Sequence, residues 1–299
     1  MAGPSSPLSF RTPTPLDYWR ALVADDATLP LVEAAASIAM DEHPEFDPGG
    51  VVDTIESMAA RLRGRLPADA APLQRLRALN RFFFQEQQFA GNVNDYHDRH
   101  NSYLHRVLEM RRGIPISLAV IYVELAREIG LKANGVSFPG HFLARVGMPQ
   151  GDVVIDPFNG QSMSREALDS MLQPYRKRRA TAGATGAAGV GAMPLALFLQ
   201  PATPRDTLAR MLRNLKELHR TSGDERLQLA VQERMVVLLP EAWDERRDRG
   251  LAHAALGDSE AAAADLATYL EQADRDAPDR EDIAERLLAL GRGRPHRLH

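Results

Sequence analysis

The sequence of 299 residues contains no cysteine. This absence excludes disulfides, thiolate metal sites, iron–sulfur clusters and a cysteine nucleophile. Basic residues are not in excess either, because 36 Lys and Arg face 40 Asp and Glu, which gives a net charge of −4 at pH 7. The sequence pI is about 6.2. A nucleic acid is therefore not an expected partner, since phosphate contacts need a basic surface.

The sequence also lacks an apolar run of about 18 residues, the length of a membrane-spanning helix. Residues 1–15 hold four prolines and no apolar segment of the kind found in signal peptides, so they are predicted to form a disordered leader. We therefore expect a cytoplasmic protein with no membrane partner. The basic run at residues 176–179 is more typical of a solvated turn than of a binding patch.

Helical patterns dominate the first third of the chain. Between residues 16 and 88, apolar residues recur at steps of three and four, which predicts three packed helices. A polar loop is expected at residues 91–103, followed by a short helix at residues 104–111. Residues 115–129 are apolar on all sides in their first half, which predicts a buried central helix. Pro115 suits the first position of that helix.

Period-two patterns predict three short strands, at residues 133–138, 142–146 and 153–155. A capped helix is expected at residues 164–172. Helices followed by a small antiparallel sheet indicate the α+β class, with the helical N-terminal part and the central helix packed on the sheet.

Composition divides the chain into segments. Residues 16–179 are predicted to form the α+β domain, and residues 180–204 an Ala- and Gly-rich linker. Residues 205–292 are predicted to form an all-α region.

The all-α region has an internal period. His219 and His253 lie 34 residues apart, as do two Gly-Asp pairs at residues 223–224 and 257–258. A 34-residue helical period is typical of tetratricopeptide repeats, which offer a concave surface to a protein or peptide partner. The alternative is two helical hairpins with coincidental turns. Because two repeats are too few for a free-standing array, they are expected to pack on the first domain or on a third helical pair.

Three polar residues are candidates for chemistry. His141 begins one predicted strand, and Asp156 ends the neighbouring one, so they could form a hydrogen-bonded pair. Ser117 lies in the first turn of the central helix, where its hydroxyl could serve as a nucleophile. Each residue also has a structural interpretation: Ser117 could satisfy backbone N–H groups, Asp156 could cap a turn, and His141 could be a structural histidine of its strand.

A family resemblance runs through these segments. Residues 113–131 resemble the central helix of the transglutaminase-like superfamily, residues 140–146 its histidine strand, and residues 155–160 its aspartate strand. The resemblance extends to residues 101–102, 111–115 and 246–252 and to the helical repeats. Over about residues 30 to 290, the chain is therefore similar to the bacterial SirB-type family. That family joins a transglutaminase-like domain to tetratricopeptide repeats, which implies a transglutaminase- or papain-like fold for the first domain.

The resemblance also bears on catalysis. Catalytic members of the superfamily carry a cysteine at the N-terminus of the central helix. Aligning Gly113 and the helix on the superfamily pattern places Pro115 at the cysteine position, whereas His141 and Asp156 match. Ser117 lies two positions later, roughly 200° around the helix. The resemblance therefore implies a domain without thiol chemistry.

Two functions follow as hypotheses. The first is a non-catalytic, regulatory or scaffolding protein that binds a protein or peptide partner through its repeats. Its cleft would be lined by His141 and Asp156 together with further polar residues, namely Asn94, Asp95, Tyr96, Asn101, Ser102 and Asn159. The alternative is an amide or ester hydrolase with Ser117 as nucleophile, His141 as base and Asp156 as the orienting carboxylate.

A zinc site is a third and weaker hypothesis. His97, His100 and His105 lie close in sequence to Asp95 and Asp98. Such spacings could converge on a metal, but loop histidines are more often solvated. Neither a metal nor another cofactor is therefore expected.

Overall fold

The computed structural model describes residues 13–181 and 194–292. Residues 1–12 of the predicted leader and residues 182–193 of the predicted linker lie outside these ranges. In the part of the chain that is described, none of the helices is long and apolar enough to cross a membrane.

The N-terminal helices are more numerous than the three that were predicted. They are α1 (Pro15–Leu22), α2 (Leu31–Ser37), η1 (Ile38–Asp41), α3 (Gly49–Arg63), α4 (Pro72–Asn80) and η2 (Arg81–Glu86). The missed helix, α1, begins at a capping box in which Thr14 and Asp17 accept hydrogen bonds from each other's backbone. Its fully buried Trp19 fixes it to the core.

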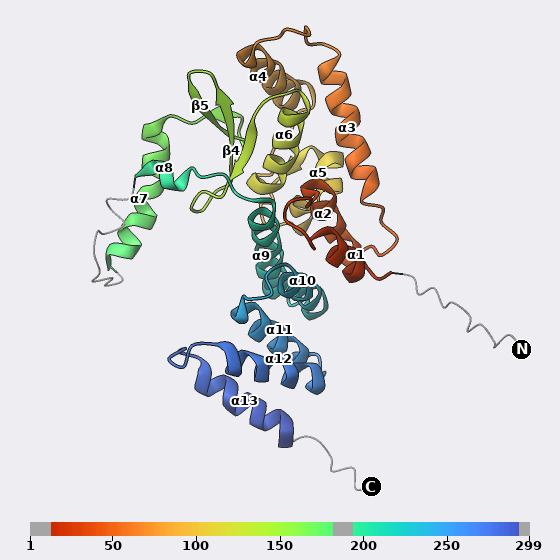
Figure 1. Cartoon of the computed structure of the whole chain (residues 1–299), viewed down its shortest axis with the longest axis vertical. Coiled ribbons are helices and arrows are strands. Elements are labelled where there is room, and N and C mark those ends of the chain that lie inside the picture. Colours follow the sequence, from red (N-terminus) through yellow and green to blue (C-terminus); the bar gives the residue numbers. More distant parts are fainter. Residues whose placement is uncertain (1–12, 182–193, 293–299) are drawn as a thin grey trace, which may run out of the picture.

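The central helix is α6 (Pro115–Glu128), and each of its residues from Pro115 to Val123 is buried. It lies between the sheet on one side and α3 on the other (Figure 1). Shorter elements precede it: β1 (Ala90–Gly91), η3 (Arg99–Ser102), α5 (Leu104–Met110) and β2 (Arg112–Gly113). The segment predicted as a polar loop therefore ends in a 3-10 turn, and β1 pairs with β2 in parallel.

The main sheet has four antiparallel strands in the order β3 (Ala133–Val136), β4 (Leu143–Met148), β5 (Gly151–Asp156) and β6 (Gln161–Ser162). The predicted strands correspond to β3, β4 and β5, whereas β6 was missed because it has only two residues. Ala144 pairs with Ile155, and both pack in the main core with α6.

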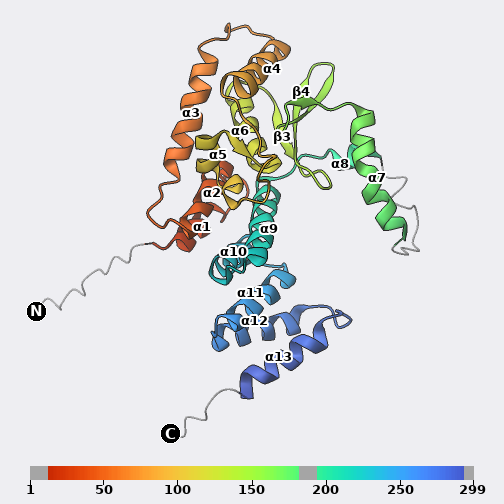
Figure 2. The ribbon, with the colours of Figure 1, turned by 180° about the vertical axis from the view of Figure 1, so that it is seen from behind.

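Helices cover the outer face of this sheet as well (Figure 2). They are α7 (Arg165–Thr181) and α8 (Leu195–Phe198). Leu168, Leu172 and Leu195 from these helices pack on Leu143 and other strand residues in a second core. Because α7 continues past Pro174 to residue 181, the backbone of residues 176–179 is helical, and the prediction of a turn there was wrong.

Five helices follow: α9 (Pro204–Ser222), α10 (Glu225–Leu238), α11 (Trp243–Ala255), α12 (Ser259–Gln272) and α13 (Arg280–Arg292). The two predicted Gly-Asp turns join α9 to α10 and α11 to α12. Gly223 and Gly257 adopt positive φ, and Asp224 and Asp258 each cap the next helix. The 34-residue period therefore corresponds to two similar hairpins, and α13 packs on the second.

The first hairpin shares its core with the α+β part of the chain. Leu208, Leu212 and Met235 are fully buried in the same apolar cluster as α2 and α6. Helices α11–α13 extend away from this body (Figure 1), and they have a small apolar cluster of their own around Leu266.

Candidate functional site

The structure brings His141 and Asp156 together. His141 follows a tight turn after β3, in which Gly140 has a φ of +70° and the His141 N–H donates to the Phe138 carbonyl. Asp156 is the last residue of β5, the strand next to β4. The His141 Nε2 and Asp156 Oδ1 atoms lie 2.9 Å apart. This is the geometry of a carboxylate that orients an imidazole.

Asp156 also holds the turn that follows β5. Its Oδ1 accepts the Phe158 N–H at 2.9 Å, and its Oδ2 accepts the Asn159 side-chain amide at 2.9 Å. The capping and orienting interpretations of Asp156 therefore apply together. Since the carboxylate is nearly buried, with 7% of its side chain exposed, each of these hydrogen bonds offsets the cost of its desolvation.

Ser117 faces the interior. The residue is fully buried, and its Oγ donates to the Asn101 carbonyl at 2.6 Å. The same oxygen accepts the Ile114 N–H at 3.2 Å, which satisfies a donor just before the helix. Among the residues described, no hydrogen bond joins Ser117 to His141. The proximity that a nucleophile needs is therefore not found, whereas the structural interpretation of Ser117 accounts for its contacts.

The predicted cleft residues fall into two groups. Asn101 and Ser102 are buried, and Asn101 holds the preceding loop by donating to the Asp95 carbonyl at 2.7 Å and accepting from Asn92 at 3.0 Å. The exposed group comprises Asn94, Asp95, Tyr96 and Asn159. Only this second group is accessible to a ligand.

The histidines considered for zinc do not converge. His97 is exposed, and the His100 Nδ1 atom lies 2.7 Å from Asp98 Oδ1. His105 packs on Phe46, with ring centroids 4.6 Å apart, and its burial lowers its pKa. Across residues 13–181 and 194–292, no group of three or more His, Asp or Glu side chains is placed to hold a metal.

Sequence reasoning missed three residues around the pair. Phe158 lies between His141 and Tyr96, with ring centroids 6.4 and 6.0 Å from theirs. Tyr175 of α7 lies against Gly140, so that a side chain at position 140 would collide with its hydroxyl. Arg210 of α9 donates to the Phe138 carbonyl at 2.9 Å. Local patterns could not identify Tyr175 and Arg210, because each lies on a helix distant in sequence from the strands.

Comparisons with known proteins agree with this architecture. The sequence profile of the transglutaminase-like superfamily matches residues 50–213, and that of the tetratricopeptide repeat matches residues 215–288. A UPF0162 protein of Xylella fastidiosa is 37% identical over 258 residues, which cover 86% of this chain and 89% of the relative. The chain belongs to the UPF0162 family. The predicted SirB-type assignment and the predicted fold class are thereby confirmed.

Other relatives match at a lower identity or over a shorter stretch. The UPF0162 protein of Pseudomonas aeruginosa is 28% identical over 273 residues, covering 90% of this chain and 94% of its own. The human F-box only protein 21 is 43% identical over 72 residues, which are 24% of this chain and 12% of that protein. No solved structure matches the chain significantly.

The contacts of Ser117 lead to a stability prediction. Ser117→Ala is expected to lower the free energy of unfolding by about 1–3 kcal/mol, because the variant leaves the buried Ile114 N–H and Asn101 carbonyl without this partner. Chemical denaturation measures the difference. Ser259→Ala, at an exposed position of α12, is the matched control and should stay within about 0.5 kcal/mol. An unchanged stability for Ser117→Ala would contradict the structural role.

Proposed function

We propose that this UPF0162 protein is a non-catalytic transglutaminase-like protein that binds a protein or peptide partner through its helical repeats. Its role in the cell would be regulatory or scaffolding. One observation carries the non-catalytic part: the first turn of α6 offers no available nucleophile. Pro115 begins the helix without a reactive side chain, and the only hydroxyl of that turn, Ser117, is buried and bonded to the backbone.

The His141–Asp156 pair does not by itself make a catalyst of this domain. In nucleophilic catalysis the base acts on a hydroxyl or thiol within hydrogen-bond reach. Here the hydrolase alternative needs Ser117 to leave the Asn101 carbonyl and turn out of the core. The pair instead supports a structural task, because Asp156 connects His141 to the Phe158–Asn159 turn.

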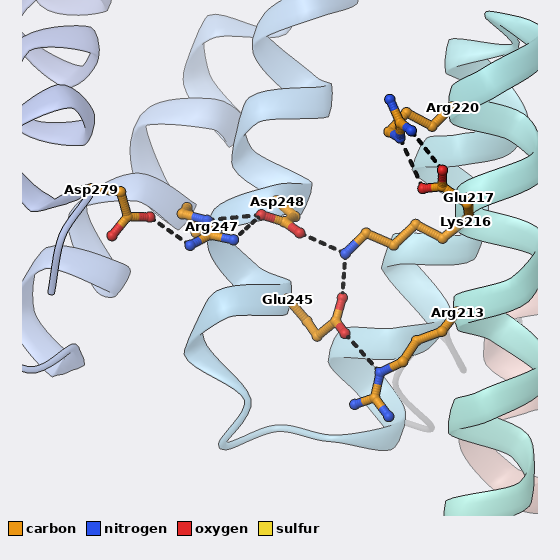
Figure 3. Close-up of polar contacts among 8 residues, drawn as sticks. All are labelled: Arg213, Lys216, Glu217, Arg220, Glu245, Arg247, Asp248 and Asp279. Carbon is orange, nitrogen blue, oxygen red and sulfur yellow. Dashed lines mark hydrogen bonds and ion pairs between the residues drawn. The ribbon is translucent and has the colours of Figure 1, made fainter. Parts of the chain in front are cut away.

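The binding part rests on how the repeats are built. A charge network connects α9 to α11 and to the start of α13 (Figure 3). Lys216 Nζ lies 2.6 Å from both Glu245 and Asp248. Burial alone lowers the Lys216 pKa, but these two carboxylates outweigh it and raise the pKa above its ordinary value. Arg247 continues the network to Asp279 at 2.5 Å.

This network is neutral within itself. Three cations, Arg213, Lys216 and Arg247, balance three carboxylates, Glu245, Asp248 and Asp279. Figure 3 also shows that Arg220 pairs with Glu217 on α9, apart from the others. The network therefore fixes the stacking of the repeats, and recognition of a partner is expected at a surface beside it.

Such a surface is a cavity of about 590 Å³ between the start of α11 and the α12–α13 connection. Trp243 and Tyr269 supply its aromatic wall. Four carboxylates and one cation line it, namely Glu241, Asp244, Asp274, Asp276 and Arg275. Arg246 and Arg247 already lie over these two rings, so the excess of carboxylates is the feature that suits a partner segment presenting a Lys or Arg side chain.

Partner capture tests the binding function. The full-length protein, immobilised and exposed to lysate of its own organism, is expected to retain a partner that the Asp274→Lys/Asp276→Lys variant loses, because the reversed charges repel a basic segment. Both aspartates are exposed, so the fold should tolerate the change. Glu281→Lys/Glu285→Lys, at exposed positions of α13 outside the cavity lining, is the matched control. Equal retention by all three proteins would contradict the cavity as the binding surface.

The same preparations test the non-catalytic part. A fluorophosphonate probe is expected to leave the protein unlabelled. Labelling at Ser117 that disappears in His141→Ala would establish the hydrolase instead.

A further inference from the structure

Arg210 is a half-buried cation placed against the turn that carries His141. It extends from α9, and its Nη1 atom donates to Ser137 Oγ at 2.8 Å and to the Phe138 carbonyl at 2.9 Å. Its guanidinium lies 5.6 Å from the centre of the Phe142 ring. Arg210 therefore holds the turn that carries His141, although it belongs to the first helix of the repeat region.

The surroundings of Arg210 do not neutralise its charge. In the described ranges, no Asp or Glu oxygen lies within 4.0 Å of its guanidinium. Two other half-buried arginines do have such a partner: Arg205 pairs with Asp26, and Arg249 with Asp265. Burial lowers the pKa of the Arg210 guanidinium, which is the expected effect of desolvating a cation. A partly desolvated, uncompensated cation is a place where an anion binds favourably.

Arg210 also has donor nitrogens that make no hydrogen bond within the described chain. Both of its hydrogen bonds within the described chain leave from Nη1, so Nε and Nη2 make none there. These two nitrogens form the side of the guanidinium that matches the two oxygens of a carboxylate. Arg210 is partly exposed, and neither nitrogen is among the buried unpaired atoms of the described residues, so both are accessible to a ligand.

Two tyrosines and a phenylalanine complete the setting. Tyr96 and Tyr175 are close enough to Arg210 to act on it electrostatically. Tyr175 also lies against Gly140, next to His141, while Phe158 lies between His141 and Tyr96. Three separate segments, the loop before η3, the β3–β4 turn and α7, thus place hydroxyl groups and aromatic rings around a cation that α9 carries.

We propose that Arg210, Tyr96 and Tyr175 form a binding site for a carboxylate ligand at the edge of the His141–Asp156 pair. One guanidinium with neutral hydroxyl donors balances a single negative charge, which favours a carboxylate over a doubly charged phosphate. The aromatic rings suit an apolar group next to that carboxylate. The ligand is either a small organic acid or the C-terminal carboxylate of a peptide, and the site is separate from the repeat cavity proposed above.

Isothermal titration calorimetry of the full-length protein tests this site. The probes are hippurate, its neutral amide hippuramide, the tripeptide Ala-Ala-Phe with a free or an amidated C-terminus, and inorganic phosphate. Each carboxylate is expected to bind at least about tenfold more tightly than its matched amide, since a charged hydrogen bond to Arg210 is lost in the amide. Tighter binding of hippurate would identify a small acid, and tighter binding of the free tripeptide would identify a peptide terminus.

Variants separate recognition from folding. Arg210→Gln is expected to weaken hippurate binding at least about tenfold, and Arg210→Lys, which keeps the charge but loses the paired donors, should weaken it to a smaller extent. Tyr96→Phe, at an exposed position, removes one hydroxyl without disturbing the core. Arg220→Gln, on the exposed side of the same helix, should bind like the native protein. Equal binding of acid and amide, tighter binding of phosphate, or native affinity in Arg210→Gln would each overturn the proposal.

Discussion

Replacing Arg234 with methionine is expected to lower the free energy of unfolding by about 3–5 kcal/mol, the range for breaking a buried ion pair. Only 1% of the Arg234 side chain is exposed. Its Nε and Nη2 atoms bind the Asp41 carboxylate at 2.7–3.0 Å, and Nη2 also donates to the Ser37 carbonyl at 3.0 Å. Methionine fills similar space but leaves Asp41 without its cation, and this unpaired charge dominates the cost.

The indole of Trp19 adds to this contact. The guanidinium lies 5.1 Å from the centre of its ring, and the Trp19 Nε1–H donates to the Arg234 carbonyl at 3.1 Å. The same residue of α10 thus holds α1 and η1 at once, although 193 residues separate it from Asp41. Arg234→Met is therefore expected to destabilise the whole protein and not α10 alone.

Denaturant titration with matched variants checks the prediction. Arg226→Ala, at an exposed position of α10, should change the free energy of unfolding by less than about 0.5 kcal/mol. Adding Asp41→Asn to Arg234→Met should recover part of the loss, because it removes the unpaired carboxylate. A cost below about 1 kcal/mol for Arg234→Met, or no recovery in the double variant, would contradict a tight buried ion pair.

Local patterns were sufficient wherever neighbouring residues determine the structure. The apolar run after Pro115 predicted α6, because a helix that is apolar on all sides must be buried. His141 and Asp156 could be paired from sequence, since His141 begins one predicted strand, Asp156 ends the next, and consecutive short strands usually lie side by side. The Gly-Asp turns predicted the hairpins of the repeats, because glycine is favoured at positive φ and aspartate caps helices.

Contacts between distant segments could not be predicted in this way. Arg210 and Arg234 lie on amphipathic helices whose sequence indicates a buried side but not which residues it meets. An arginine in such a helix is more often solvated, so nothing marks these two as buried. The inward direction of Ser117 was likewise decided by the Asn101 carbonyl, which the fold brings against α6 from another segment.

Truncating the chain near its predicted domain boundary is expected to have the largest effect on stability. Composition favours a boundary in the Ala- and Gly-rich segment at residues 180–204, but the apolar core continues into α9 and α10. We expect a chain truncated after residue 203 to lose its cooperative unfolding transition. It would expose the surfaces that Leu208, Leu212 and Met235 cover, and removal of one such side chain already costs about 2–5 kcal/mol. Over the three side chains these losses reach about 6–15 kcal/mol, as much as the whole stability of a typical domain, about 5–15 kcal/mol.

A second truncation isolates the cause. A chain ending at residue 242 keeps α9 and α10 but lacks α11–α13, whose apolar cluster around Leu266 is separate from the main core. This chain should retain a cooperative transition in thermal circular dichroism, at a lower melting temperature than the full-length protein because Lys216 loses Glu245 and Asp248. Cooperative unfolding of the shorter chain, residues 1–203, would instead show that the first hairpin is dispensable. Because α9 also carries Arg210 to the turn before His141, the shorter chain should lose hippurate binding, whereas residues 1–242 should keep it.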